Sequence, residues 1–324
     1  MAKPPKPPRN HHYVPQLLLR RFTAPDGTLW VYDLEKTEIY PAQPKSAGFV
    51  RDLYSRIAPD GTSDHAIIEN LTAERVDKPG NAAIRRLLAK EDLFAMGSPW
   101  NDFLIFVAAQ LQRTPAFFDR MSSMTQPTMQ EMLQRMAKHD PEFRERVRLS
   151  SLARGLAESE VEKALQQAAN GGFRIKPAKD FVVSMSFALV HGIFEELRQM
   201  TWQIATLAES DRDLILGDHP VLPVVPPGDR VGLRHPAIHV KLPLSPRVAA
   251  VGNWNLQTTY ATFHKGEAQK INADTMRHAK RFLFASYKSE ELLAQAKKLH
   301  GTGPKVHIRR VKNGKQLMFV HEYL

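Results

Sequence analysis

Apolar and polar residues alternate near the start of the chain and again in its last third. This two-residue period predicts β-strands with one buried face. The predicted strands are residues 29–34, 38–42, 49–57, 239–254, 282–287, 306–311 and 317–323, and residues 214–217, a continuous apolar run, are predicted to form a buried strand. Ser245-Pro246 is expected to break the segment at 239–254. Lys312-Asn313-Gly314-Lys315, between the last two segments, is typical of a β-hairpin turn.

The middle of the chain has its apolar residues spaced as in helices. The predicted helices are residues 17–22, 64–74, 81–90, 100–113, 117–139, 141–156, 158–169 and 181–202. Asp64 is the expected N-cap of the second helix, and Pro79-Gly80 is expected to separate the second helix from the third. Residues 181–202 are apolar nearly all round, which predicts a helix central to the core.

The order of these elements predicts an α+β fold with a small N-terminal β region, a helical middle and a C-terminal mixed or antiparallel sheet. Residues 1–9 are expected to form a basic, Pro-rich tail. A single domain is predicted over residues 10–290, and a basic helix with a β-hairpin over residues 291–324. Within the domain, the predicted parts are a β-rich start at 10–62, a helical part at 63–202 and a β-rich end at 203–290.

The composition narrows the class of protein. With 43% apolar and 24% charged residues, the chain can bury a core, which excludes disorder along its full length. The absence of cysteine excludes disulfides, thiolate nucleophiles and iron–sulfur clusters. The longest apolar window, residues 181–194, is too short to span a membrane, and the first residues lack the apolar stretch of a signal peptide. We expect a protein of the cytoplasm with no membrane partner.

The charge is strongly positive and unevenly distributed. The net charge is +11, and residues 265–324 carry 13 Lys and Arg against 5 Asp and Glu, a net of +8. An excess of this kind suits a polyanion such as nucleic acid, and a solubilising surface without a partner is the alternative. The expected contacts to nucleic acid are the basic residues of the last hairpin, Arg309, Arg310, Lys312 and Lys315.

The segment Asn10-His11-His12-Tyr13-Val14-Pro15-Gln16 has the densest concentration of chemically active residues. Two imidazoles beside an amide and an arginine suit proton transfer or metal binding on a phosphate substrate. Since neighbouring residues of an extended chain face opposite sides, His11 and His12 are not expected to share a metal. One imidazole would face the site and the other would anchor the segment. An N-terminal segment held only by hydrogen bonds of buried His and Gln is the alternative.

Gln16 and Arg20 lie four residues apart, on one face of the short predicted helix. That face could present an amide and a guanidinium to an anion. Arg113 ends a predicted helix before Thr114-Pro115, a position that the helix dipole alone favours. Arg113 is a candidate functional residue only if its side chain points at the His segment.

Two acidic residues complete the candidates. Asp218-His219-Pro220 follows a short apolar strand, and an Asp at such a place can orient an imidazole or bind a divalent cation. Ordinary turn chemistry is the alternative interpretation of this segment. Glu69, beside Ile67 and Leu71 on a predicted helix, is a candidate buried acid and the second candidate metal ligand.

Two segments have the residue spacing of known nuclease motifs. His-His-x-x-Pro at residues 11–15 is similar to the first motif of HNH nucleases, but a Leu-rich helix follows where that family has a ββα unit. Arg230 and His235 have the Arg-x4-His spacing of HEPN ribonucleases. The prolines that flank them predict a loop where that motif needs a helix, so we discount it.

The His-His-Tyr-Val-Pro-Gln motif, followed by Leu19-Arg20-x-Phe22, resembles the opening of the bacterial domain-of-unknown-function 4238 family. Gln110-x-x-Arg113-Thr114-Pro115 and Gly217-Asp218-x-Pro220 follow in the family's order, although Ser is more usual at position 217. The resemblance covers roughly residues 10 to 290. It implies no reaction, but it implies functional positions. These are His11, His12, Gln16, Arg20, Glu69, Arg113 and Asp218.

These observations favour a phosphodiester hydrolase acting on nucleic acid, with Mg²⁺ or Mn²⁺ as its candidate cofactor. His11 or His12 would be the general base or a metal ligand, and Arg20 with Arg113 would stabilise the phosphate. Asp218 and Glu69 would bind the cation or orient the imidazole. The alternatives are a non-catalytic binder of nucleic acid or ribonucleoprotein, and a small-molecule or nucleotide-binding sensor. A site of this kind requires His11 or His12, Arg113 and Asp218 to converge.

Overall fold

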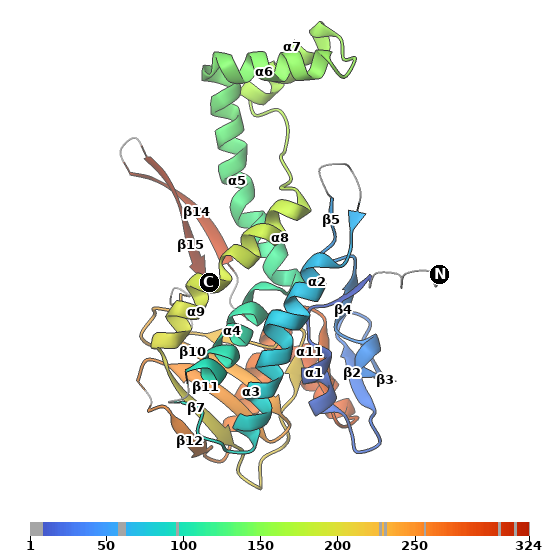
Figure 1. Cartoon of the computed structure of the whole chain (residues 1–324), viewed down its shortest axis with the longest axis vertical. Helices are drawn as coiled ribbons and strands as arrows, with labels where there is room; N and C mark the ends of the chain where they lie inside the picture. The colour runs from blue at the N-terminus through green and yellow to red at the C-terminus, as the bar shows by residue number, and fades with distance from the viewer. Residues whose placement is uncertain are drawn as a thin grey trace. The chain divides into compact units, whose positions relative to one another are not determined.

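The computed structural model describes the backbone of residues 9–57, 63–94, 97–226, 229, 232–255, 257–303, 306–313 and 316–323, and the side chains of these residues except 56, 57, 63 and those after 303. The chain divides into two compact units (Figure 1). One unit is Phe118–Val182, and the other joins Met1–Phe117 to Val183–Leu324.

The larger unit contains a four-stranded antiparallel sheet with the order β3-β2-β13-β8. Its strands are β2 (Leu29–Asp33), β3 (Glu38–Ala42), β8 (Leu216–Gly217) and β13 (Phe282–Ala285). The strands predicted at 29–34, 38–42 and 282–287 are confirmed, and that at 214–217 is shorter than predicted. Since β13 pairs with both β2 and β8, the sheet joins the start of the chain to its last third.

A mixed five-stranded sheet has the order β12-β7-β11-β10-β9, with β12 parallel to β7 and the other pairs antiparallel. Its strands are β7 (Thr201–Thr206), β9 (Leu222–Val224), β10 (His239–Ser245), β11 (Val248–Asn253) and β12 (Thr259–Thr262). The predicted break at Ser245-Pro246 is confirmed. Trp202 is fully buried over Gly252, where an added Cβ would lie 2.7 Å from its indole.

The segment predicted as one long helix over residues 181–202 is helical over most of its length, but it is not a single helix and it ends before Thr201. The segment forms α8 (Lys179–Ala188) and α9 (Val190–Gln199), and β7 starts at Thr201. Phe181 and Leu189 are 41% and 39% exposed, so the segment is not central to the core. The apolar run of residues 181–194 lies within these two helices, so it predicts helix correctly and misses only the break at Leu189 and the start of β7.

The predicted break at Pro79-Gly80 is also wrong. Helix α2 (Ile67–Thr72) continues through a π-helical turn, η3 (Ala73–Asp77), into α3 (Lys78–Leu88). The wider turn lies directly before Pro79, which lacks the N–H of a regular helical bond. Asp64 does not occupy the N-cap, which is Ala66, but its carboxylate accepts from the N–H groups of Ala66 and Ile67. Helix α3 packs on α4 (Ser98–Gln112) through Gly80.

The N-terminal strand β1 (Asn10–His12) pairs with β4 (Phe49–Arg51), and α1 (Gln16–Leu19) continues into the 3₁₀ turn η1 (Arg20–Phe22). The strand predicted at 49–57 is interrupted, because Asp52 has a positive φ of 57° and the next strand, β5, is Arg56–Ile57. Strand β5 pairs with β6 (Ser63–Asp64). A 3₁₀ turn, η2, covers Pro44–Ser46.

The last third adds α10 (Glu267–His278), α11 (Glu290–Leu299) and the predicted hairpin, now seen as β14 (Val306–Asn313) and β15 (Gln316–Tyr323). The turn residues Gly314 and Lys315 lie outside the described residues. The α+β class is confirmed. The division into residues 10–290 and 291–324 stays a prediction.

The smaller unit contains the three predicted helices of the chain's middle. They are α5 (Pro115–His139), which begins in the larger unit, α6 (Pro141–Leu152) and α7 (Glu158–Ala169). Asp140 caps α6 by accepting the N–H of Phe143 at 2.9 Å. Helix α6 ends earlier than the predicted Leu156, before a turn in which Gly155 has a φ of 85°. None of the helices in the described ranges is long and apolar enough to cross a membrane.

Gly80 offers a test of the helix packing. A Cβ at this position would lie 2.6 Å from Phe106 Cβ, so Gly80→Ala forces α3 and α4 apart. We expect a loss of about 1–3 kcal/mol in the free energy of unfolding. Gly192→Ala in α9 is the matched control, since nothing lies within 4 Å of its added Cβ. That change should stabilise by up to about 1 kcal/mol, as measured by urea unfolding. Equal effects of the two changes would contradict the packing.

Candidate functional site

The His pair occupies two different environments. In the antiparallel pairing of β1 with β4, His11 lies opposite Val50 and His12 opposite Phe49. The side chain of His11 is fully buried, whereas that of His12 is half-buried. The alternation of an extended strand therefore gives each imidazole separate neighbours.

His11 anchors the N-terminal segment. Its Nδ1 accepts the backbone N–H of Tyr54 at 2.8 Å, and its ring stacks on that of Tyr54 with centroids 5.5 Å apart and planes within 8°. Acceptance at Nδ1 means that the neutral ring carries its proton on Nε2. With 0% exposure, this imidazole is shielded from solvent.

His12 is half-buried as a residue, but its Nε2 atom is itself buried. Its ring packs against Phe49 with centroids 5.6 Å apart, and among the described residues its Nε2 has no hydrogen-bond partner. Burial lowers the pKa of His12 below its usual 6.5, and the positive charge of Arg113 acts in the same direction. The ring is therefore neutral at neutral pH and can accept a proton.

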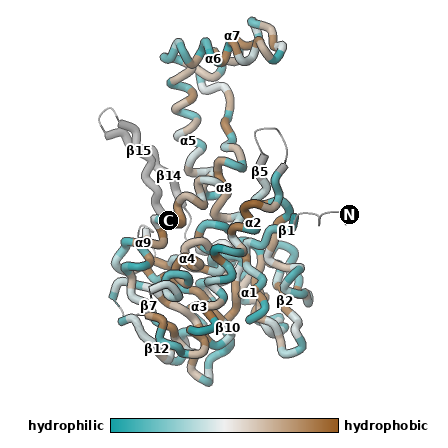
Figure 2. The backbone as a smooth tube through the Cα atoms, in the orientation of Figure 1, coloured by the Kyte–Doolittle hydropathy of each residue, from teal (hydrophilic) through white to brown (hydrophobic). Residues whose placement is uncertain are grey.

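Glu69 lies next to His12, on α2. Its Oε1 accepts the backbone N–H of His12 at 3.4 Å. Burial raises the pKa of Glu69 to about 7, although the His12 N–H and Arg113 oppose the shift. Glu69 is half-buried, and its apolar neighbours on the helix are exposed. Ile67 and Leu71 are 55% and 59% exposed on α2, an apolar segment in Figure 2.

Arg113 points toward the His segment but is fully enclosed. Its guanidinium is 1% exposed and lies 2.9 Å from a carboxylate oxygen of Asp77 in η3. With the amide of Gln110 turned to present its oxygen, Arg113 Nε donates to it at 2.6 Å. The backbone carbonyl of Arg113 accepts the hydroxyl of Tyr54 at 2.8 Å. Arg113 therefore acts by positioning α4, η3 and the turn that holds His11.

Burial raises the pKa of Asp77, and the nearby Arg113 guanidinium opposes that shift. The positive charge of Arg113 and the negative charge of Asp77 therefore offset one another where the side chains are 1% and 22% exposed. Nothing in the sequence singles out Asp77 or Tyr54, since each lies far along the chain from Arg113. These two residues are the members of the site that sequence analysis missed.

Asp218 has partners other than His12 and Glu69, and its carboxylate already accepts three hydrogen bonds. Its carboxylate accepts the backbone N–H groups of Lys280, Arg281 and Phe282 at 2.8, 2.7 and 2.9 Å. Burial raises the pKa of Asp218 while these three donors lower it. The carboxylate thus fixes the approach to β13, and its contacts do not include His11, His12 or Arg113 among the hydrogen bonds of the described chain.

The predicted motifs nevertheless meet beside Asp218. Together with Tyr13, Pro115, His219 and Arg281 it lines a cavity of about 220 Å³. His219 Nδ1 lies 3.4 Å from the hydroxyl of Thr114, directly after Arg113. The first motif, the Arg-Thr-Pro motif and the Asp-His-Pro turn are therefore spatial neighbours, with Arg113 and Asp218 each engaged by other partners.

Gln16 and Arg20 lie on one face of α1 and η1, as their spacing requires. Arg20 is exposed and donates to the Gln16 side chain at 3.4 Å. Across the described part of the chain, no hydrogen bond or ion pair links these two side chains to His12 or Glu69. Their predicted role in catalysis stays a prediction.

The remaining predicted site residues concern cation and nucleic-acid binding. Within the described ranges no three His, Asp or Glu side chains lie together as a metal site requires, and Glu69 and Asp218 have separate partners. Arg309, Arg310 and Lys312 lie on β14, opposite Val320, Phe319 and Leu317. Lys315 lies outside the described residues.

The raised pKa of Glu69 has a consequence for stability. Since its folded-state value of about 7 exceeds the ordinary 4.5, the stability contributed by the protonated carboxyl is full below 4.5 and is lost as the pH rises through 7. Glu69→Gln should therefore raise the free energy of unfolding at about pH 8 by on the order of 1–2 kcal/mol, after discounting for partial exposure, and so raise the Tm there. At about pH 4 it should leave the Tm nearly unchanged.

The exposed Glu38→Gln is the matched control and should change the Tm little at either pH, as surface substitutions do. Calorimetric melting of the three proteins checks this expectation. A gain at both pH values, or at neither, would contradict the buried carboxyl.

Comparison with known proteins adds one finding. A family model with the description "Protein of unknown function (DUF4238)" matches residues 10–289. Searches of curated proteins and of solved structures found no match. The family match extends from β1 through α10 and β13 and includes His12, Glu69, Arg113 and Asp218. The chain therefore belongs to the DUF4238 family, as the resemblance over residues 10 to 290 predicts.

Proposed function

We propose that the protein is a phosphodiester hydrolase acting on nucleic acid, with His12 and Glu69 as its proton-transfer pair. The observation that carries the proposal is the contact between the Glu69 carboxylate and the backbone N–H of His12, which makes two half-buried titratable residues neighbours. Burial brings the pKa of His12 below 6.5 and that of Glu69 to about 7. A neutral base thus lies beside a protonated acid near neutral pH, which is the state that acid–base catalysis requires.

In this mechanism His12 accepts the proton of the attacking hydroxyl, from water or from the ribose. The oxygen bonds to phosphorus, the bond from phosphorus to the leaving oxygen breaks, and Glu69 donates its proton to that oxygen. His11 holds the strand, and Arg113 positions the pair and supplies positive potential near the phosphate. These proton transfers need no metal ion, and the cofactor to test is Mg²⁺ or Mn²⁺.

The charge supports nucleic acid as the substrate class. The net charge of +11 attracts a polyanion, and the basic last third with Arg309, Arg310, Lys312 and Lys315 would hold its backbone. The proposal places enzyme and substrate in the cytoplasm, where a chain without cysteine needs no oxidising environment.

A second candidate is a non-catalytic nucleic-acid-binding protein. It is favoured by the saturation of His11, Arg113 and Asp218, whose polar atoms bind protein partners. In that case the N-terminal motif would serve the fold, and the basic surface alone would serve the function. Affinity that falls steeply with salt, without turnover, distinguishes this candidate.

The test is incubation of the purified protein with end-labelled RNA and DNA, with and without Mg²⁺ or Mn²⁺, between about pH 5 and 9. We expect a bell-shaped rate profile. The rate should rise as His12 loses its proton below 6.5 and fall as Glu69 ionises through about 7. His12→Ala and Glu69→Gln should each reduce the rate by about 10²–10⁴-fold.

His264→Ala is the matched control, because that imidazole is exposed on the loop before α10. It should leave the rate unchanged. Absence of cleavage with every substrate and cation, or equal cleavage by the His12→Ala protein, would overturn the hydrolase and leave the binding protein.

A further inference from the structure

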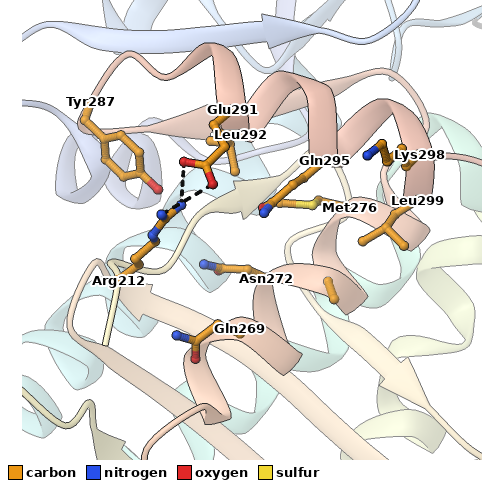
Figure 3. Close-up of a pocket in the computed structure, with 11 residues that line it drawn as sticks. Arg212, Gln269, Asn272, Met276, Tyr287, Glu291, Leu292, Gln295, Lys298 and Leu299 are labelled. Carbon is orange, nitrogen blue, oxygen red and sulfur yellow. Dashed lines mark hydrogen bonds and ion pairs between the residues drawn. The ribbon is translucent and has the colours of Figure 1, made fainter. Parts of the chain in front are cut away.

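A second cavity, of about 430 Å³, opens between α10 and α11 of the larger unit (Figure 3). Arg212 and Tyr287 lie at one end, Lys298 lies at the other, and Met276 and Gln295 lie between them. None of its lining residues belongs to the site of His12 and Glu69. The volume lies within the range of small-molecule pockets, about 300–1,000 Å³.

The floor of this cavity is part of the hydrophobic core. Met276 and Leu292 are 3% and 5% exposed and pack in the cluster that also contains Leu283 of β13. Leu299 packs against the same cluster from α11. The floor is therefore apolar and held by the sheet, so it can support a flat ring.

The backbone on both sides of Arg212 is anchored to α10. The carboxylate of Asp211 accepts the N–H of Gly266, at the start of α10, at 3.0 and 3.2 Å. Asn272 donates to the carbonyl of Asp213 at 2.9 Å and accepts the N–H of Ile215 at 3.0 Å. The loop that carries Arg212 thus has a fixed place at the rim, and a ligand need not order it.

The two ends of the cavity differ in charge. Arg212 donates to both carboxylate oxygens of Glu291, at 3.1 and 3.4 Å, beside the ring of Tyr287 (Figure 3). This pair is 61% and 60% exposed, so it is weak and offers both donors and an acceptor to a ligand. Lys298 has no ion pair among the residues described, so the opposite end carries a net positive charge.

We propose that this cavity binds a nucleoside monophosphate. The base would lie on the floor of Met276, Leu292 and Leu299, with its hydrogen-bonding edge toward Arg212 and Glu291. The phosphate would contact Lys298. A ring with both donors and acceptors matches the end that holds Arg212 and Glu291. One anionic group matches Lys298 at the other end, and the apolar floor between them suits a flat body. The site shares no residue with the proposed hydrolase and does not depend on it.

The test is titration calorimetry of the full chain with GMP, AMP, CMP and UMP. Ribose 5-phosphate, which lacks the base, and guanosine, which lacks the phosphate, are the partial ligands. We expect at least one nucleoside monophosphate to bind about tenfold or more tightly than either partial ligand. Lys298→Glu should weaken that binding about tenfold or more, whereas Lys297→Glu, an equal charge change next along α11, should not.

Ala273→Phe, which fills the cavity from α10, should abolish binding in a protein whose Tm and circular dichroism show it to be folded. His12→Ala should bind the nucleotide as the unmodified chain does, which separates this site from the hydrolase. Failure of all four nucleotides to bind overturns the proposal. So do equal effects of Lys297→Glu and Lys298→Glu, equal affinity for ribose 5-phosphate and the nucleotides, or undiminished binding by a folded Ala273→Phe protein.

Discussion

The buried ion pair between Arg113 and Asp77 joins the elements from which the candidate site is built. It ties the end of α4 to the π-helical turn between α2 and α3. The carbonyl of Arg113 holds the hydroxyl of Tyr54, and the N–H of Tyr54 holds His11. Removing the guanidinium would leave a buried carboxylate without its partner, a cost of about 3–5 kcal/mol. The place of β1, and so of His12 beside Glu69, depends on this chain of contacts.

Burial gives the His12–Glu69 pair its chemical character. In water a glutamate with a pKa of 4.5 is ionised before a histidine with a pKa of 6.5 becomes neutral, so no pH favours a neutral base beside a protonated acid. Desolvation disfavours both charged forms, which moves the pKa of His12 down and that of Glu69 up. The order of the two values is thereby reversed. A protonated carboxyl and a neutral imidazole can then coexist near neutral pH.

Three acidic side chains of this basic protein, those of Asp33, Asp211 and Asp218, hold parts of the fold together. Asp211 and Asp218 each accept backbone N–H groups at the start of an element, and Asp33 binds Arg281 across the four-stranded sheet. These contacts fix the loops that carry Arg212, His219 and Arg281. The two cavities lined by Arg212 and by Asp218 therefore have rims on backbone that carboxylates hold in place.

Local sequence signals were sufficient to predict an element whose conformation depends mainly on its own residues. The strand at 38–42, the helix at 158–169 and the C-terminal hairpin follow from their periods and turns. The same signals predict helix correctly over most of residues 181–202, but they miss the break at Leu189 and the start of β7 at Thr201, where pairing with β11 and β12 sets the strand. Pro79 fails as a breaker because a π-helical turn accommodates it.

The sequence by itself determined the α+β class, the family, the basic charge and the candidate residues His12 and Glu69. It also required His11 and His12 to have different neighbours, because side chains alternate along a strand. Only the tertiary structure decided that His11 is an anchor, that Arg113 pairs with Asp77, and that three backbone N–H groups occupy Asp218. The reason is physical. Burial and partners far along the chain set the charge and the access of each group, and neither follows from the residues beside it.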